Sequence, residues 1–256
     1  MLSIVTRALC LSDIEQLYTT IKRKLSKQIE LIVVARKENF FLSDENVTVI
    51  IEDSNRFEAR KSGILAAKGN ILLLDNDQIP SELLLIELQN IKADAVIIPE
   101  RSLNRNLVGR LLDFQRNYFQ ELAKPTFSPY FPVVPRFYRN DIIKNVVNNL
   151  DTFVFKYGLS HEDSILYYEI YKDLKYLTES KNYIYNLDPS MLEYIRKSIL
   201  YGRYRKSTFN AKRIPKNYID LINEINKEFL RIRNNKSILN LCISSLRAVP
   251  YFFGSL

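Results

Sequence analysis

Five short apolar runs, rich in β-branched residues, recur through the first hundred residues and constrain the fold more than any other feature. They span Leu2–Thr6, Glu30–Ala35, Val47–Ile51, Asn70–Leu74 and Asp94–Pro99. Runs of this length and composition are typical of strands that are covered on both faces, as in parallel sheets. Helical patterns alternate with them, so we expect right-handed crossovers between strands. The sequence therefore predicts an α/β fold with a mostly parallel sheet flanked by helices.

Two local signals predict where the early helices begin and end. Ser12-Asp13-Ile14-Glu15 has the spacing of a capping box, in which the Ser and Glu side chains satisfy exposed backbone N–H groups. Gly69 follows the helical stretch Arg56–Lys68, and glycine readily takes the left-handed conformation that often ends a helix. We therefore expect a side-chain cap near Ser12 and a left-handed glycine at position 69.

The pattern changes after about residue 100. Asn106–Leu122 has the apolar spacing of a helix, a proline-rich irregular segment follows, and helical runs then continue to the end of the sequence. A chain of 256 residues is near the upper limit for one hydrophobic core. We therefore predict one domain over residues 1–205, with halves at about 1–100 and 101–205, and a basic, apolar helical extension over 206–256.

Charge and cysteine content narrow the possible ligands and compartments. Lys and Arg outnumber Asp and Glu by 37 to 29, a net charge of +8 that suits phosphate-bearing small molecules, nucleic acid or an anionic membrane surface. Cys10 and Cys242 are the only cysteines, which argues against a disulfide framework or zinc ribbon and favours a reducing, cytosolic compartment. We find no secretory leader and no run of about 20 apolar residues, so we expect neither secretion nor a membrane span.

Two carboxylates, Asp75 and Asp77, directly follow the fourth apolar run. Ligands of open α/β sheets gather outside the carboxyl ends of the strands, which is where these side chains are expected. A hard divalent ion with oxygen ligands commonly makes such a pair of charges tolerable, and it can also hold a diphosphate. The structural alternative is that Asp75-Asn76-Asp77 caps a following helix that starts around Pro80-Ser81.

Three segments carry recognisable motifs: EARKSGILAAKGNILLLDND at Glu58–Asp77, HEDSIL at His161–Leu166 and RKSILYGRYRKS at Arg196–Ser207. In the same order they resemble three motifs of the family-2-like glycosyltransferases of the GT-A, nucleotide-diphospho-sugar transferase fold. These are the Ala-Arg-Asn-x-Gly-Ile…Ala-x-Gly…Asp-x-Asp block, the Glu-Asp-x-x-Leu segment and a basic stretch containing Tyr-Gly. Lys61 replaces the usual Asn. The resemblance covers about residues 2–207 and implies a GT-A fold.

The resemblance also implies a chemistry: transfer of a single sugar, by a metal-dependent and inverting reaction, from a nucleotide diphosphate sugar to an acceptor hydroxyl or lipid phosphate. The cofactor would be Mn²⁺ or Mg²⁺, held with the diphosphate by Asp75 and Asp77. Asp163 would be the base that takes the acceptor proton, with Glu162 contacting acceptor or substrate. The residues implied in donor and nucleotide binding are Thr6, Arg7, Arg36, Arg60, Asp75 and Asn76.

Glu162 and Asp163 also have a structural interpretation. Acidic residues in the first turn of a helix complement its dipole, and a predicted helix begins at this point. His161 is the only histidine in the chain, so a Ser-His-Asp triad or a multi-histidine metal site is limited to it. We interpret His161 as a solvated residue at the helix start, with contact to the diphosphate or metal as the alternative.

The sequence departs from the family pattern in two places. The family usually carries an Asp after its second strand that reads the nucleoside, whereas this chain has Ala35-Arg36-Lys37-Glu38. After the first strand, Thr6-Arg7-Ala8 replaces a Pro-x-Tyr-Asn-type turn. The sequence therefore does not indicate which nucleoside the donor carries. The Gln-x-x-Arg-Trp signature of processive synthases cannot occur because the chain has no Trp, so we expect a single transfer.

Two further segments bear on the acceptor. Ser237–Leu256 is apolar but carries Arg247, Pro250 and Gly254. It is expected to pack on the domain or a partner subunit, or to lie against a membrane and bring the enzyme to a lipid-linked acceptor. The aromatic-rich stretch Phe127–Tyr138 is expected either to line an acceptor cleft or to pack in the core.

Three rival functions remain at this stage. A nucleotidyltransferase would need a glycine-rich, lysine-bearing phosphate loop near the first strand, which the sequence does not show. A basic nucleic-acid-binding module has no recognisable signature here, so we expect no nucleic acid partner. The third is a non-catalytic relative that binds nucleotide sugars. It remains an alternative because the family's usual Asp after the second strand is missing here.

Overall fold

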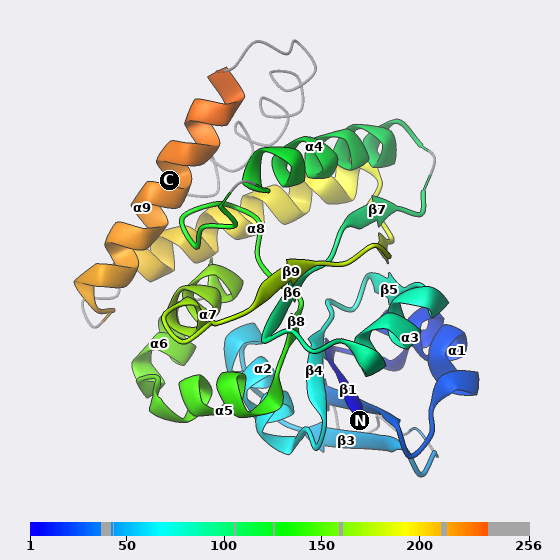
Figure 1. The fold of residues 1–256 in the computed structure, drawn as a ribbon. Helices are drawn as coiled ribbons and strands as arrows, with labels where there is room; N and C mark the ends of the chain where they lie inside the picture. Colours follow the sequence, from blue (N-terminus) through cyan, green and yellow to red (C-terminus); the bar gives the residue numbers. More distant parts are fainter. Residues whose placement is uncertain are drawn as a thin grey trace. The chain divides into compact units, whose positions relative to one another are not determined.

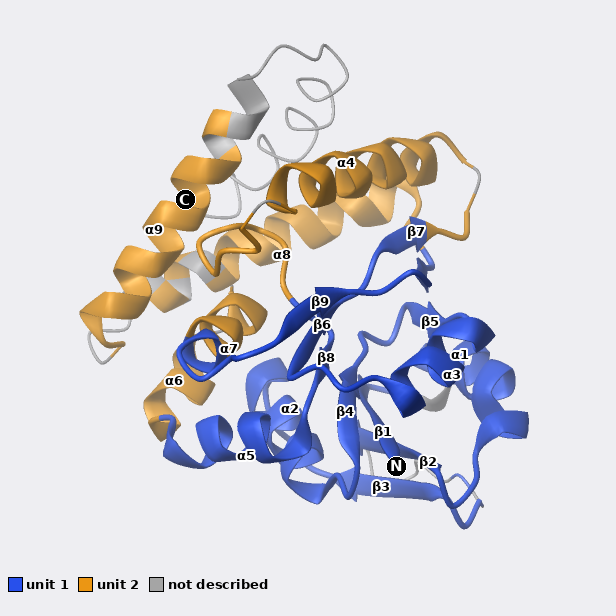
Figure 2. Cartoon of the chain, in the orientation of Figure 1, with its two compact units in different colours: residues 1–101, 135–150, 169–187 blue, residues 102–134, 151–168, 188–256 orange. Residues whose placement is uncertain are grey.

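The computed structural model describes residues 1–36, 42, 44–104, 106–124, 126–158, 161–210 and 214–234 (Figure 1). The chain divides into two compact units (Figure 2). Unit 1 comprises Met1–Arg101, Pro135–Leu150 and Glu169–Leu187, and unit 2 comprises Ser102–Val134, Asp151–Tyr168 and Asp188–Leu256. Each unit is thus assembled from three separate segments. The predicted limits of residues 1–205 and 206–256 stay a prediction, and Ser237–Leu256 lies outside the described residues.

Unit 1 is built on a seven-stranded sheet with the strand order β3-β2-β1-β4-β8-β6-β9. The strands are β1 (Leu2–Ala8), β2 (Ile29–Ala35), β3 (Val47–Ile51), β4 (Asn70–Leu73), β6 (Ala95–Ile97), β8 (Phe137–Tyr138) and β9 (Leu177–Glu179). The first four along the sheet are parallel, β8 is antiparallel to both of its neighbours, and β9 is parallel to β6. The predicted α/β class with a mostly parallel sheet is confirmed, and all five predicted strands are present.

A second, three-stranded sheet has the order β5-β10-β7. It consists of β5 (Gln78–Pro80), β7 (Glu100–Ser102) and β10 (Ile184–Asn186), with β10 antiparallel to β5. Because β5 follows β4 after a short turn, this small sheet lies at the carboxyl end of β4. β5 therefore directly follows the Asp75–Asp77 segment, and Leu187, the residue after β10, donates its N–H to the carbonyl of Asp77.

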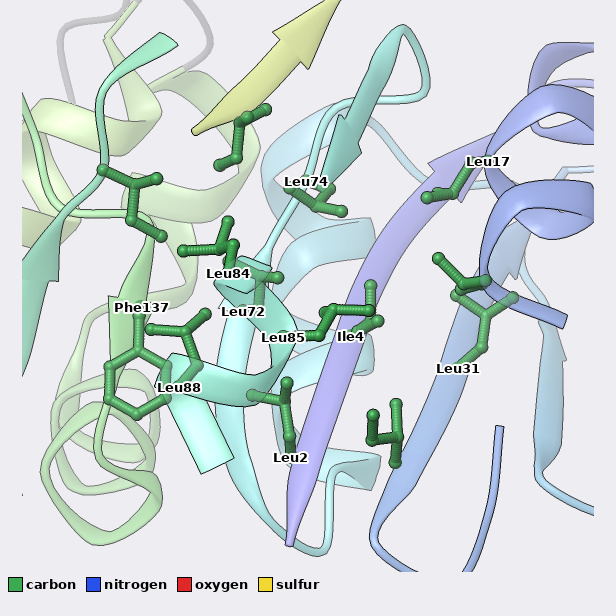
Figure 3. Packing of buried hydrophobic residues seen from close by; sticks show 14 of the residues in the cluster. Leu2, Ile4, Leu17, Leu31, Leu72, Leu74, Leu84, Leu85, Leu88 and Phe137 are labelled. Carbon is green, nitrogen blue, oxygen red and sulfur yellow. The ribbon is translucent and has the colours of Figure 1, made fainter. Parts of the chain in front are cut away.

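One face of the large sheet is covered by α1 (Glu15–Ile21) and α3 (Glu82–Asn90). Figure 3 shows the buried side chains that join these layers: Leu2, Ile4, Leu31, Leu72 and Phe137 from the sheet, Leu74 directly after β4, Leu17 from α1, and Leu84, Leu85 and Leu88 from α3. From β1 the cluster takes Leu2, Ile4 and Ala8, which share one face of the strand because successive side chains point to opposite faces. This packing fixes the carboxyl end of β4.

The other face of the sheet is covered by α2 (Arg56–Ala66), which contacts α5 (Asn140–Asn149). The helix approaches the strands closely at Gly63, where an added Cβ would overlap Cγ1 of Val5 and lie 3.4 Å from Cγ2 of Val34. Asn55 caps α2 by accepting hydrogen bonds from the N–H groups of Phe57 and Glu58. The side-chain cap therefore fixes where α2 begins, and the close contact at Gly63 holds the middle of the helix against the strands.

Two predictions about helix ends are wrong. The N-cap of α1 is Ile14 and makes no side-chain hydrogen bond. Asp13 instead accepts hydrogen bonds from the N–H groups of Leu9 (2.7 Å) and Cys10 (2.9 Å), because a 3₁₀ turn over Leu11–Asp13 precedes the helix. No described glycine has a positive φ. Gly69 is needed for space, since an added Cβ would overlap the carbonyl oxygen of Met1.

Unit 2 is helical. It contains α4 (Leu107–Ala123), α6 (Thr152–Tyr157), the part of α7 (Glu162–Tyr171) up to Tyr168, α8 (Met191–Asn210) and α9 (Lys216–Asn234). α4 and α9 meet where the rings of Phe119 and Phe229 lie 5.3 Å apart. Within the described residues, no helix is long and apolar enough to cross a membrane.

Candidate active site

The segment Asp75–Gln78 forms a tight turn between β4 and β5. The N–H of Gln78 donates to the carbonyl of Asp75 (3.0 Å), and the N–H of Leu187 donates to the carbonyl of Asp77 (2.7 Å). Asn76 is exposed at the tip of the turn, whereas Asp75 and Asp77 are half-buried. The apolar strand thus ends in a turn that is hydrogen-bonded through the carbonyls of Asp75 and Asp77, and the two carboxylates lie at the carboxyl end of β4, where the sequence places them.

The turn does not cap the following helix. Ser81 is the N-cap of α3, and its side chain accepts a hydrogen bond from the N–H of Leu84 (3.2 Å). Pro80 is the last residue of β5 and is not in the first turn of the helix. The capping interpretation of Asp75-Asn76-Asp77 is therefore wrong, and these residues need another explanation.

The carboxylate of Asp75 lies between two arginines. Arg60 Nη2, from α2, donates to Asp75 Oδ1 at 2.6 Å, and Arg136 Nη2 lies 3.5 Å from Asp75 Oδ2. The side chains of Arg60 and Arg136 are only 6% and 12% exposed, so both charges depend on buried or half-buried partners. Burial alone would raise the pKa of Asp75, but the two guanidinium charges outweigh it and hold that pKa well below its usual range.

Arg136 is the residue that the sequence did not single out. It precedes β8, and its Nε donates to Glu100 Oε1 at 3.0 Å. Burial would lower the pKa of Arg136, but Glu100 and Asp75 raise it above the ordinary value. The only sequence signal was a basic residue inside an apolar, proline-rich segment, where a charge is unexpected unless it is paired.

A second group of predicted donor residues lies at the carboxyl ends of β1, β2 and β3. Arg7 Nη2 donates to the carbonyl of Ser54 at 3.1 Å, and Arg36 Nε lies 2.5 Å from Asp53 Oδ1. The pair of Arg36 and Asp53 is exposed. Within the described residues, the buried hydroxyls of Thr6 and Ser54 have no hydrogen-bond partner. A buried hydroxyl without a partner is costly, which makes both groups available to a bound ligand.

The predicted catalytic carboxylates lie at the start of α7. Glu162 is only 2% exposed, Asp163 is half-buried, and the carbonyl of His161 accepts a hydrogen bond from the N–H of Ile165 (2.9 Å). A carboxylate buried to this extent needs charge or hydrogen-bond partners, unlike a solvated residue that only complements a helix dipole. These residues belong to unit 2, whereas Asp75 and Asp77 belong to unit 1.

The aromatic-rich stretch Phe127–Tyr138 contains both buried and exposed rings. Phe137 and Tyr138 form β8 and are fully buried in the core of unit 1. Tyr130 is exposed, and its ring lies 6.0 Å from that of Tyr168. The expectation of core packing is therefore correct for the end of the stretch.

Solved structures with a similar fold cover almost the whole chain. A fragment of TarS from S. aureus, residues 1–349, matches with a TM-score of 0.53 and 14% identity over 99% of this chain and 80% of that one. The same fragment has been solved in complex with UDP-GlcNAc, and it matches with a TM-score of 0.52. The mannosyltransferase PcManGT from Pyrobaculum calidifontis, in complex with GDP-Man and Mn²⁺, matches with a TM-score of 0.54 and 12% identity over 99% of this chain and 82% of that one.

The chain has the GT-A fold of nucleotide-sugar glycosyltransferases. The sequence matches no protein-family model. No curated protein matches it either. The fold predicted from the three motifs is confirmed, while the family-2-like assignment within the GT-A glycosyltransferases stays a prediction.

The carboxylates of the Asp75–Asp77 turn fit a metal ion that is also coordinated by a bound ligand. No group of three or more His, Cys, Asp or Glu side chains could surround an ion in the described part of the chain. The carboxylate of Asp75 is already bound by Arg60. Mg²⁺ and similar hard ions are commonly held by one or two carboxylates together with substrate phosphates and water. The chemistry of the Asp75–Asp77 turn agrees with that type of site.

Proposed function

We propose that the protein is a glycosyltransferase that moves a single sugar from a nucleotide diphosphate sugar to an acceptor hydroxyl or lipid phosphate. The observation that carries this proposal is the Asp75–Asp77 turn, held at the carboxyl end of β4 beside the buried Arg60 and the half-buried Arg136. In an open α/β sheet this is the edge where ligands bind. The GT-A neighbours that bind UDP-GlcNAc, or GDP-Man with Mn²⁺, support the donor class.

The donor would be bound along the ends of β1 to β4. Thr6 and Arg7 would contact the nucleoside, and the exposed pair of Arg36 and Asp53 would stand in for the single carboxylate that the family usually has after the second strand. Arg60 and Asn76 would contact the nucleotide or its phosphates. The net charge of +8 suits this doubly charged diphosphate.

A divalent ion, Mn²⁺ or Mg²⁺, would be held by Asp77 together with the diphosphate, with Asp75 behind it. When bound, the ion neutralises charge on the departing nucleoside diphosphate. The arginines next to Asp75 add positive charge on the same side. The expected consequence is that nucleoside diphosphate binding depends on the ion.

Asp163 would be the general base, because direct displacement with inversion requires a group that takes the acceptor proton. Glu162 would contact acceptor or substrate from the first turn of α7. His161 would lie beside them at the helix start. A lipid phosphate acceptor is already ionised near neutral pH and needs the base less.

The test is a release assay. The protein is incubated with Mn²⁺ and, one at a time, UDP-, GDP- and TDP-linked sugars, and nucleoside diphosphate release is measured alongside the shift in melting temperature. We expect one donor class to raise the melting temperature, because a ligand that binds the native state stabilises it, and to be slowly hydrolysed. A protein that neither binds nor hydrolyses any of these donors would not be a glycosyltransferase of this kind.

The same assay separates the main alternative, a non-catalytic protein that binds nucleotide sugars. This alternative is favoured by the replacement of the family's carboxylate after β2 by Arg36. It predicts a clear thermal shift with a donor and no release above the uncatalysed rate, even when acceptors are added.

If the acceptor is lipid-linked, we propose that the protein contacts the membrane that carries it. Ser237–Leu256 would supply this contact, and deleting these residues would reduce sedimentation with anionic liposomes more than it reduces donor hydrolysis. Unchanged sedimentation would favour packing of the segment on protein.

A further inference from the structure

A closed circuit of polar contacts begins and ends at Asp75. The Asp75 N–H donates to Gln78 Oε1 (3.0 Å), and Gln78 Nε2 donates to Asn186 Oδ1 (3.1 Å). Asn186 Nδ2 donates to Glu100 Oε2 (3.1 Å), whose other oxygen accepts from Arg136 Nε (3.0 Å). Arg136 Nη2 then returns to the Asp75 carboxylate at 3.5 Å.

The circuit joins strands that are far apart in the sequence. Gln78 lies on β5, Asn186 on β10 and Glu100 on β7, so all three strands of the small sheet contribute one side chain. Gln78 and Asn186 are buried. Buried amides are stabilising only when both of their ends are satisfied, so this arrangement is highly constrained.

The hydrogen bonds run in one direction only. The backbone N–H of Asp75 can only donate, so the Gln78 oxygen must face it and the Gln78 nitrogen must face Asn186. The carboxylate of Glu100 can only accept, so the Asn186 nitrogen must face it. A fixed donor at one end and a fixed acceptor at the other therefore leave each amide a single orientation.

We propose that Arg136 and Glu100, linked by Asn186 and Gln78, are positioning residues that hold the Asp75–Asp77 turn in its donor-binding geometry. This inference rests on the proposed function. Asp75 is held at its carboxylate by Arg60 and Arg136 and at its N–H by Gln78. Fixing one end of the turn this firmly sets the direction of Asp77 two residues later.

The circuit makes an unusual prediction for Glu100→Gln, which keeps the shape of the side chain. The nitrogen of the new amide must face either Asn186 Nδ2 or Arg136 Nε. Both of these groups donate to Glu100 in the wild-type protein, so a donor would then face a donor. Turning Asn186 over to compensate would also turn Gln78, which would then present its nitrogen to the Asp75 N–H. The double variant Glu100→Gln with Asn186→Asp moves the carboxylate by one position and satisfies every donor again.

The experiment is calorimetric titration with UDP and with GDP, each with Mn²⁺, and a thermal melt of each variant without ligand. We expect Glu100→Gln and Arg136→Met to weaken binding about tenfold, and the double variant to recover to within about threefold of the wild-type protein. The control is Arg139→Met. Arg139 lies three residues after Arg136 in the sequence and forms an ion pair with the buried Asp94 (2.6 Å), but it is not part of the circuit. This substitution should lower the melting temperature and leave binding within about twofold.

Each outcome decides the proposal. Wild-type affinity in folded Glu100→Gln, or a double variant that binds no better than the single one, would overturn it. If Arg136→Met does not fold, the comparison of Glu100→Gln with the double variant still decides. A wild-type protein that binds neither UDP nor GDP would instead contradict the proposed function, which makes the two failures distinguishable.

Discussion

Arg60 Nη2 donates to Asp75 Oδ1 at 2.6 Å, which joins α2 to the turn after β4 through a buried ion pair. Asp75→Asn would remove the negative charge that Arg60 and Arg136 share, although Arg136 would keep its ion pair with Glu100. Since removing one partner of a largely buried ion pair is costly, we expect a loss of about 2–3 kcal/mol in the free energy of unfolding. Chemical denaturation near pH 7 measures it, and an unchanged midpoint would contradict the role of Asp75 as the shared partner.

The same pair predicts a dependence on pH. The pKa of Asp75 is depressed in the folded state, so its contribution to stability is complete above the unfolded pKa of about 3.9 and is lost as pH falls through the folded value. The difference in unfolding free energy between wild type and Asp75→Asn should therefore be constant from about pH 5 to 8 and shrink below about pH 4. A difference that grows on acidification would contradict this sign.

Gly63 tests how closely α2 packs on the sheet. Gly63→Ala would overlap Cγ1 of Val5, and overpacking of this kind costs about 1–3 kcal/mol, more than the roughly 1 kcal/mol that alanine gains in a helix. In a Val5→Ala background the overlap is gone, so the same substitution should be neutral or stabilising. A double-mutant cycle by thermal denaturation measures the coupling, and additive effects would show that the two residues do not compete for space.

In unit 2, Arg116 binds Asp188 with both guanidinium nitrogens, and one of these hydrogen bonds is 3.0 Å long. The Asp188 side chain is almost fully buried, so Arg116→Met should cost about 3 kcal/mol of stability. Lys227→Met is the control, because its ion pair with Glu224 is exposed and should be worth less than about 1 kcal/mol. Equal effects of the two substitutions would mean that burial does not strengthen the first pair.

Asp163→Asn separates catalysis from binding. The variant keeps its shape but cannot accept a proton, so transfer to a hydroxyl acceptor should fall by about 10²–10⁴-fold while donor binding barely changes. Transfer kinetics and donor calorimetry on the same preparation measure both quantities. Transfer to a hydroxyl acceptor at the wild-type rate would remove Asp163 from the mechanism.

The sequence located the Asp75–Asp77 turn because its signal is local. An apolar strand that runs into two carboxylates places them at the carboxyl end of a sheet, whatever the rest of the chain does. The five strands β1, β2, β3, β4 and β6 were equally predictable from their β-branched runs. The carboxyl end of β4 and its acidic turn therefore followed from about ten consecutive residues.

Arg136 and β8 could not be found in this way. β8 has only two residues, too few for any periodicity, and it is antiparallel in a sheet that otherwise reads as parallel. Arg136 reaches Asp75 because β8 pairs with β4, a contact between residues about sixty positions apart. The capping prediction at Ser12 failed for a different, local reason: a 3₁₀ turn precedes α1, and Asp13 accepts hydrogen bonds from the N–H groups of Leu9 and Cys10.

The most direct test of the account is a calorimetric titration of UDP and GDP, with Mn²⁺ and with excess chelator. It compares wild type, Asp77→Asn and the control Glu82→Gln, whose carboxylate is exposed and paired with Lys24. We expect wild type to bind at least one of the two nucleotides, and we expect the chelator to weaken this binding. Asp77→Asn should lower the affinity at least about tenfold, equivalent to about 1.4 kcal/mol, and Glu82→Gln should not. Equal binding by Asp77→Asn and wild type, unaffected by chelator, would contradict a donor site at the Asp75–Asp77 turn.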